Sequence, residues 1–124
     1  MEKFVIEKTV TEEMLAVNVG SGSLRVLATP VVATMMENAS SCLADTMIEE
    51  GITTVGVSLD LSHTSPTPVG AKVKVQAVCT ENDGRTFHFQ CVAFDDAGEI
   101  ARCNHTRVSV KAEKFQEKAD HKYE

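Results

Sequence analysis

Alternating apolar and polar positions predict several β-strands along this chain. A β-rich run occupies residues 3–10, and four further runs follow at 53–64, 71–80, 85–94 and 100–110. In residues 53–64, the side chains predicted to share one face are Val55, Val57, Leu59 and Leu61. Such a repeat at every second position is typical of a strand with one buried face. Tight-turn sequences at 82–84 and 95–98 join the last three runs and predict antiparallel pairing.

One long helix is predicted between the first run and the others, over residues 30–50. Its apolar positions recur at helical spacing and are Val32, Met35, Met36, Ala39, Leu43 and Met47. Thr29 is the expected N-cap, Pro30 suits the first helical position, and Gly51 suits the position after the last turn. A helix of about 21 residues would be roughly 31 Å long. It would therefore lie at the centre of the domain.

The order of these elements predicts an α+β fold. A single long helix must pack on one face of an antiparallel sheet of about five strands, which is the hotdog arrangement. We expect one domain over residues 1–124, with a polar tail that frays from about residue 113. Thr11 and the two glutamates after it predict a short helical piece, and residues 20–23 (GSGS) predict a loop.

Composition and charge exclude several classes of function. The net charge of -6 argues against nucleic-acid binding, which requires clustered cations. No apolar stretch approaches the roughly 20 residues of a membrane span, and the first ten residues lack the apolar core of a signal peptide. Because Cys42, Cys79, Cys91 and Cys103 form no CxxC pair, they are expected to be reduced thiols of a cytoplasmic protein, without a bound metal.

Three side chains are candidates for chemistry, although each also has an ordinary explanation. Glu37 lies beside the apolar stripe of the helix, as a surface carboxylate or as one held in a pocket. Thr29 caps the helix, at a terminus whose free N–H groups also suit acyl chemistry. His63 ends a strand and is a loop histidine or a proton carrier. His105 and Arg107 share one face of the last strand, which faces either solvent or a dimer partner.

Taken together, these segments resemble the fluoroacetyl-CoA thioesterase family of hotdog proteins. The stretches VLATPVVATMMENAS, SHTSPTPVGAKVKV and HTRVSVKAEKF match that family in order and spacing over roughly residues 24–115. The resemblance implies that Thr29, Glu37 and His63 are catalytic, that the substrate is a small acyl-CoA thioester, and that a homodimer carries its active sites between subunits. It does not extend to the family's aromatic lid, since residues 20–27 read GSGSLRVL, so fluoroacetyl specificity is not implied.

Substrate contacts are expected from Gly70, Arg107, Val31 and Met36, and no cofactor is expected beyond the CoA of the substrate. The cations considered for the CoA phosphates are Arg25, Lys72, Arg107, Lys111 and Lys114. Two other functions stay open from the sequence. A non-catalytic acyl-CoA binding or sensing module would keep the pocket without needing the three polar residues. A hotdog hydratase or dehydratase would carry an Asp/His motif that we do not find.

Overall fold

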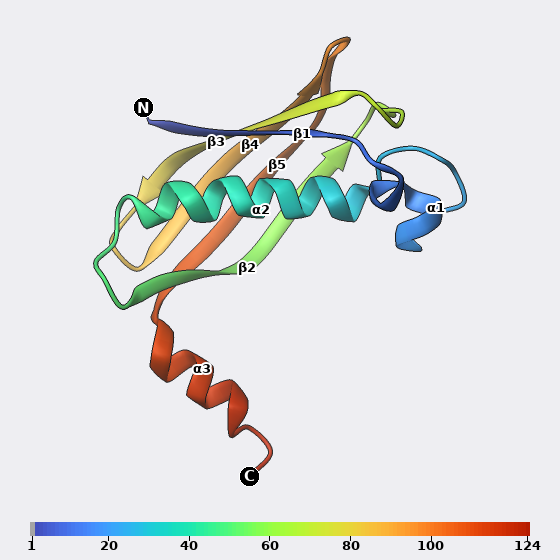
Figure 1. Cartoon of the computed structure of the whole chain (residues 1–124). Helices are drawn as coiled ribbons and strands as arrows, with labels where there is room; N and C mark the ends of the chain where they lie inside the picture. The colour runs from blue at the N-terminus through green and yellow to red at the C-terminus, as the bar shows by residue number, and fades with distance from the viewer. Residues whose placement is uncertain (1) are drawn as a thin grey trace.

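Five strands form one antiparallel sheet in the computed structural model, which describes residues 2–124. The strands lie in the order β1-β3-β4-β5-β2 (Figure 1). Their bounds are β1 (Lys3–Thr9), β2 (Ile52–His63), β3 (Lys72–Asn82), β4 (Thr86–Asp95) and β5 (Gly98–Lys111). Each expected strand is thus confirmed to within two residues at either end, and β1 and β2 are the two edges.

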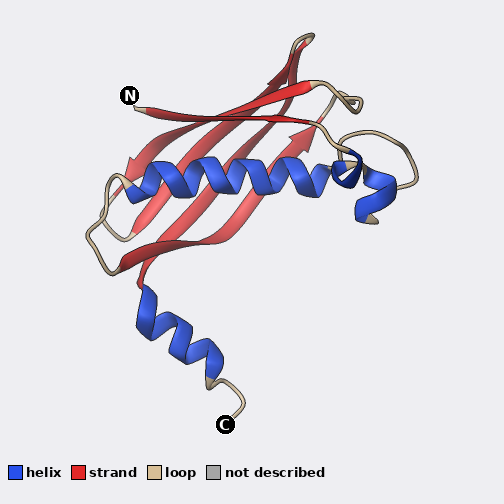
Figure 2. Cartoon of the chain, in the orientation of Figure 1, coloured by secondary structure: helices blue, strands red, loops and turns tan. Residues whose placement is uncertain are grey.

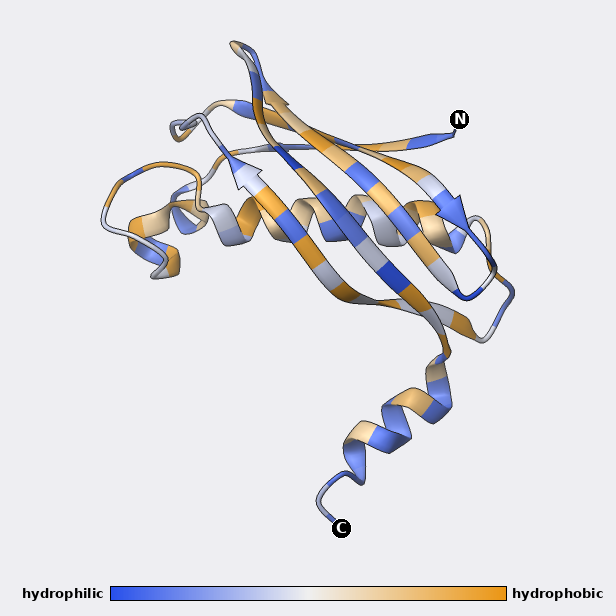
Figure 3. Ribbon diagram, turned by 180° about the vertical axis from the view of Figure 1, so that it is seen from behind, coloured by the Kyte–Doolittle hydropathy of each residue, from blue (hydrophilic) through white to orange (hydrophobic). Residues whose placement is uncertain are grey.

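Helix α2 (Thr29–Asp45) crosses one face of this curved sheet (Figures 1 and 2). Its buried side contains the predicted apolar residues Val32, Met35, Met36, Ala39 and Leu43. They pack in one core with the inward side chains of β3 and β4, among them Val73, Val75, Phe87 and Phe89. Seen from behind, the strands alternate between hydrophilic and hydrophobic bands (Figure 3). The α+β hotdog arrangement predicted from the sequence is confirmed.

Both ends of α2 differ from the prediction. Ala28, with extended backbone angles, is the N-cap, so Thr29 is the first helical residue and its hydroxyl makes no capping bond. At the other end the helix stops at Asp45 rather than near residue 50. Thr46 causes this early stop, because its hydroxyl and its N–H both donate to the carbonyl of Leu43, at 2.7 and 3.1 Å. These bonds satisfy a carbonyl that would otherwise continue the helix.

Strand β2 carries a bulge that the alternating pattern did not predict. Gly56 pairs with Arg107 and Ser58 with Thr106, so one extra residue of β2 stands against β5. An inserted residue reverses the faces beyond it. The expectation that Val55 shares a face with Leu59 and Leu61 was therefore wrong. Gly56, Leu59 and Leu61 lie on the helix-facing side, opposite the buried Arg107, His105 and Cys103 of β5.

The remaining elements are short helices. Thr11 begins the 3-10 helix η1 (Glu12–Met14), as expected, and α1 (Ala16–Val19) follows it. The polar tail forms α3 (Ala112–Asp120), which is exposed throughout and extends from the end of β5 (Figure 1). Over residues 2–124 the model contains no helix long and apolar enough to cross a membrane.

Candidate active site

The Thr29 hydroxyl and the His63 imidazole lie next to each other at the N-terminus of α2. The distance between Thr29 Oγ1 and His63 Nδ1 is 2.7 Å, a hydrogen bond of normal length. Thr29 belongs to the first turn of α2, and His63 is the last residue of β2. The fold therefore joins a hydroxyl and a potential base that are 34 residues apart in the chain.

A small pocket of about 260 Å³ opens at this pair. It lies between α1 with its following loop, the start of α2 and the segment after β2, and its lining includes Ala16, Ser21, Leu27, Thr29, His63 and Pro66. These side chains are small or aliphatic, and none is aromatic apart from the imidazole. This volume lies slightly below the range of about 300–1,000 Å³ that is usual for ligand pockets, so the pocket suits a small ligand or one part of a larger one.

His63 is held in its neutral form by its surroundings. Burial lowers the pKa of His63 below the ordinary imidazole value, and an interaction with the backbone of Ser65 offsets part of this effect. Its Nε2 atom is buried and has no hydrogen-bond partner among residues 2–124. A neutral imidazole beside a hydroxyl can accept the hydroxyl proton, which is the arrangement that activates a nucleophile.

Glu37 lies on the same helix but at a second location, above the bulge of β2. Its Oε2 atom is 3.7 Å from Nη1 of Arg107, and its side chain is 48% exposed. Gly56 makes room for this carboxylate, since a Cβ atom at that position would stand 2.7 Å from Glu37 Oε2. Sequence analysis did not select Gly56. The only signal for it was a glycine within a strand pattern, which often marks a bulge or a close approach.

Arg107 forms the floor beneath Glu37. Its Nε and Nη2 donate to the hydroxyl and carbonyl oxygens of Thr54 at 2.8 and 2.9 Å, and its Nη1 donates to Nε2 of His105 at 3.2 Å. His105 Nδ1 in turn donates to the carbonyl of Ser58 at 2.7 Å, which fixes its tautomer. Both side chains are buried, so they do not face solvent. Burial, with Arg107 adding to it, lowers the pKa of His105.

Within one chain these two locations are separate. Thr29 and Glu37 are eight residues apart on α2, which corresponds to about 12 Å along the helix axis. Gly56 and His63 lie at the corresponding positions along β2, seven residues apart. A single chain therefore brings Thr29 to His63 and Glu37 to Arg107, but it does not bring all three predicted catalytic side chains into contact.

The other predicted substrate contacts lie in different surroundings. Met36 is fully buried in the core, and Val31 packs partly buried against it. Gly70 forms the turn before β3, where its N–H donates to the carbonyl of Val10 at 2.8 Å. Residues 2–124 contain no group of three or more His, Cys, Asp or Glu side chains arranged to hold a metal ion.

Comparisons with known proteins show which family the chain belongs to. The family model described as fluoroacetyl-CoA-specific thioesterase matches residues 10–113. The fluoroacetyl-CoA thioesterase of Streptantibioticus cattleyicolor is 31% identical over 97 residues, which cover 78% of this chain and 70% of that protein. A solved structure of a mutant of the fluoroacetyl-CoA-specific thioesterase FlK with fluoroacetate and CoA superposes with a TM-score of 0.90 at 25% identity. It covers 98% of this chain and 99% of the other.

A more distant structure supports the fold alone. This Thermus thermophilus protein of the thioesterase superfamily superposes with a TM-score of 0.88 at 23% identity, covering 97% of this chain and 89% of its own. Both the family model and the curated relative span most of the chain, including the segments that carry Thr29, Glu37 and His63. The chain therefore belongs to the family of fluoroacetyl-CoA-specific thioesterases.

Proposed function

We propose that this protein hydrolyses small acyl-CoA thioesters to the free acid and CoA, with Thr29, Glu37 and His63 as its catalytic residues. The observation that carries the proposal is the 2.7 Å contact between Thr29 Oγ1 and His63 Nδ1 at the opening of a small pocket. Membership of a thioesterase family supports the reaction type. No cofactor is needed, because CoA is part of the substrate and the three side chains supply the required groups.

The start of α2 offers a donor for the developing oxyanion. Pro30 has no N–H, and the N–H groups of Val31 and Val32 already bond to the carbonyl of Ala28. The N–H of Thr29 has no hydrogen-bond partner among residues 2–124 and remains available. A thioester carbonyl oxygen at this position would meet an N–H donor and the positive end of the helix. The same residue thus supplies a hydroxyl and an oxyanion donor.

Two chemical routes use these groups. In the covalent route His63 takes the proton of Thr29, the threonine oxygen attacks the thioester carbonyl, and the CoA thiolate leaves with the proton from His63. Water then hydrolyses the acyl-threonine. In the direct route Glu37 orients a water that attacks the carbonyl, the neutral imidazole of His63 takes the proton of that water, and the resulting imidazolium gives it to the leaving CoA thiolate. Mass spectrometry of protein quenched during turnover separates the routes, because only the first leaves an acyl group on the peptide containing Thr29.

The active site is completed in a homodimer. Glu37 lies about 12 Å along the helix from Thr29, so a partner subunit must bring its own Thr29 and His63 close to this carboxylate. Strand β2 supports such an assembly, because it is an edge of the sheet and carries both Gly56 and His63. An unpaired edge strand favours pairing with a second copy. Val57, at the bulge, is 57% exposed on this edge.

Subunit mixing tests the shared site directly. Glu37→Gln and His63→Ala dimers should each retain no more than about 1% of wild-type activity. Exchange between them should restore about a quarter of wild-type activity, since half of the dimers are mixed and hold one complete site. If all three residues act within one chain, mixing restores nothing. Scattering or sedimentation that finds only a 13.4 kDa species at micromolar concentration would also contradict the dimer.

The acyl group is small and not restricted to fluoroacetyl. No Phe or Tyr occurs between residues 5 and 86, so the loop before α2 offers no aromatic lid. Release of free CoA from acetyl-CoA, followed with a thiol reagent, tests the activity, and stoichiometric binding without turnover would favour the binding-module alternative.

The four cysteines are all free thiols, which supports a reducing compartment such as the cytoplasm.

A further inference from the structure

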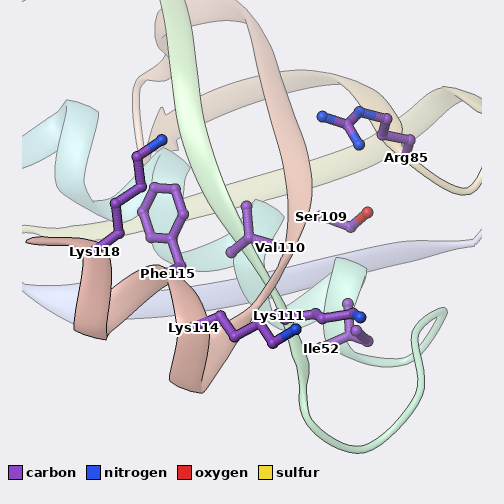
Figure 4. A pocket seen from close by; sticks show the side chains of 8 residues that line it. All are labelled: Ile52, Arg85, Ser109, Val110, Lys111, Lys114, Phe115 and Lys118. Carbon is purple, nitrogen blue, oxygen red and sulfur yellow. The ribbon is translucent and has the colours of Figure 1, made fainter.

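A second cavity lies well away from the Thr29–His63 pocket, between α3 and the end of the sheet. This groove has a volume of about 460 Å³. Its lining consists of Ile52, Arg85, Ser109, Val110, Lys111, Lys114, Phe115 and Lys118 (Figure 4). The first residue of β2, the last residues of β5 and one side of α3 thus meet in one concave surface, which we call the α3 groove. Neither catalytic route uses any of these side chains.

The α3 groove concentrates positive charge on a protein of net charge -6. Its four cations are Arg85, Lys111, Lys114 and Lys118, and none of them forms an ion pair with any residue in 2–124. On α3, Lys114 and Lys118 are four residues apart and lie on one side of the helix. The acidic residues of α3, Glu113, Glu117 and Asp120, are not among the residues that line the groove. Unpaired cations gathered in a concave site attract an anionic ligand.

An aromatic ring gives the groove a second recognition element. Phe115 points from α3 toward the strands, between Lys114 and Lys118 in sequence (Figure 4), and it remains 44% exposed. Ile52 and Val110 add apolar surface beside it. A planar ring flanked by cations suits a ligand that combines phosphate groups with a flat heterocycle, because phosphates bind the ammonium groups and a base stacks on the ring.

The groove lies within reach of Glu37 along the sheet. Lys111 is four residues from Arg107 on β5, and Ile52 is four residues from Gly56 on β2, so each is about 13 Å from the floor beneath Glu37. The pantetheine arm of CoA joins three units through two amide bonds, and because these units have longer backbones than a peptide residue, each extends roughly 5 Å and the arm about 15 Å. The arm can therefore span this separation when extended.

We propose that the α3 groove binds the nucleotide end of CoA. Lys111, Lys114, Lys118 and Arg85 bind its phosphates, and Phe115 stacks on its adenine, while the pantetheine arm runs along β5 and β2 toward Glu37. This inference rests on the proposed acyl-CoA hydrolysis and identifies the part of the substrate that gives the enzyme its affinity for CoA esters. The helix α3 acquires a role in substrate recognition despite its distance from the catalytic groups.

The test compares two substrates that differ only in the nucleotide. In Lys114→Gln/Lys118→Gln, the ratio of kcat/KM for acetyl-CoA to kcat/KM for S-acetylpantetheine should fall about tenfold, through a higher KM for acetyl-CoA, as expected for two lost charge-assisted phosphate contacts. The control Lys8→Gln/Lys74→Gln removes two exposed cations from β1 and β3, with the same change of net charge, and should keep the wild-type ratio.

Calorimetry with CoA itself separates failure of the groove from failure of the proposed function, because it needs no hydrolysis. Weaker CoA binding by Lys114→Gln/Lys118→Gln and by Phe115→Ala, with unchanged binding by the control, supports the groove even in a protein without turnover. If hydrolysis occurs but the double variant keeps both the wild-type substrate ratio and wild-type CoA affinity, the inference is overturned. An equal loss in the Lys8→Gln/Lys74→Gln control would also overturn it, since the effect would then be one of net charge.

Discussion

Thr29 Oγ1 and His63 Nδ1 are 2.7 Å apart although Thr29 occupies the position where a helix-capping threonine would be expected. The cap itself is Ala28, so the hydroxyl of Thr29 is not used by the helix backbone. This arrangement removes an ambiguity from the sequence, in which the same hydroxyl could serve the helix or the chemistry. In the folded chain its one hydrogen-bond partner among residues 2–124 is the imidazole.

Substitutions of Thr29 therefore test the role of its hydroxyl in the reaction without removing a helix cap. Thr29→Ala should lose most activity, yet it should destabilise the fold by only about 1 kcal/mol, because an exposed hydrogen bond and not a helix cap is lost. Thr29→Ser keeps a hydroxyl and should retain measurable activity. Steady-state rates with acetyl-CoA and thermal unfolding check both statements. Wild-type turnover by Thr29→Ala would show that the hydroxyl has no part in the reaction.

Much of the fold could be predicted because its signals are local. Alternation fixed the five strands to within two residues, and the apolar stripe identified the face of α2 that is buried. The end of α2 could not be found this way. Gly51 carries a positive φ of 85° and looks like a helix terminator, but α2 ends at Asp45, six residues before Gly51, where the hydroxyl of Thr46 donates to the carbonyl of Leu43. Competition between two possible stop signals depends on tertiary packing.

The candidate site was predictable only in part, for a related reason. Thr29, Glu37 and His63 could be named from their segments, but their separation into two locations depends on the path of β2 beside α2. Gly56 was missed because its importance comes from a carboxylate that approaches across space. Likewise, the polar face expected for His105 and Arg107 is a buried network, since both point under the helix. Periodicity shows that two residues share a face but not what covers it.

Substitution of Gly56 tests whether its missing side chain positions Glu37. In Gly56→Ala the new Cβ would stand 2.7 Å from Glu37 Oε2 and 3.1 Å from Cε1 of His105. The carboxylate is the end of a flexible, half-exposed side chain and would swing aside, so kcat should fall at least tenfold while the unfolding free energy changes by about 1 kcal/mol. Kinetics and denaturant unfolding measure the two quantities separately.

A double-mutant cycle shows whether Gly56 acts through Glu37. If the added methyl group displaces only that carboxylate, Gly56→Ala should cause no further loss of kcat in a Glu37→Gln background. Additive losses in the two variants would mean that Gly56 matters for a different reason, and the positioning role would have to be abandoned.

Replacement of the buried Arg107 by lysine should lower the free energy of unfolding. It donates three hydrogen bonds, two to Thr54 and one to His105, and its side chain is only 8% exposed. An ammonium group cannot occupy these three directions, so Arg107→Lys should lower the unfolding free energy by about 2–4 kcal/mol. Arg102→Lys is the control, because Arg102 is 64% exposed and pairs only with Glu99. A loss below about 0.5 kcal/mol in Arg107→Lys, typical of a surface position, would contradict the network.

The pH dependence of hydrolysis should report the neutral imidazole of His63. Burial lowers the pKa of His63, so kcat/KM should be constant near neutral pH and fall on the acid side, with a midpoint below the ordinary value of about 6.5. A pH–rate profile with acetyl-CoA measures it, and the acid limb should be absent from the residual activity of His63→Ala. A midpoint above 7 would mean that the charged imidazole is favoured in the folded protein.

The free energy of unfolding should also depend on the protonation of His63 and His105, and the direction of their pKa shifts sets whether stability rises or falls with pH. Burial lowers the pKa values of both His63 and His105 in the folded chain, so the unfolded chain binds more protons between the folded and unfolded values. The contribution of these residues to stability is therefore complete above about pH 6.5 and is lost as the pH falls through that window. Thermal unfolding should show a Tm that is level from pH 8 to 7 and decreases toward pH 5.

His63→Ala should flatten part of this decrease, because one of the two histidines that must be buried uncharged is gone. If the Tm instead rises between pH 7 and 5, the histidines gain stabilising partners when charged, and the acid limb of the rate profile cannot be assigned to a neutral His63.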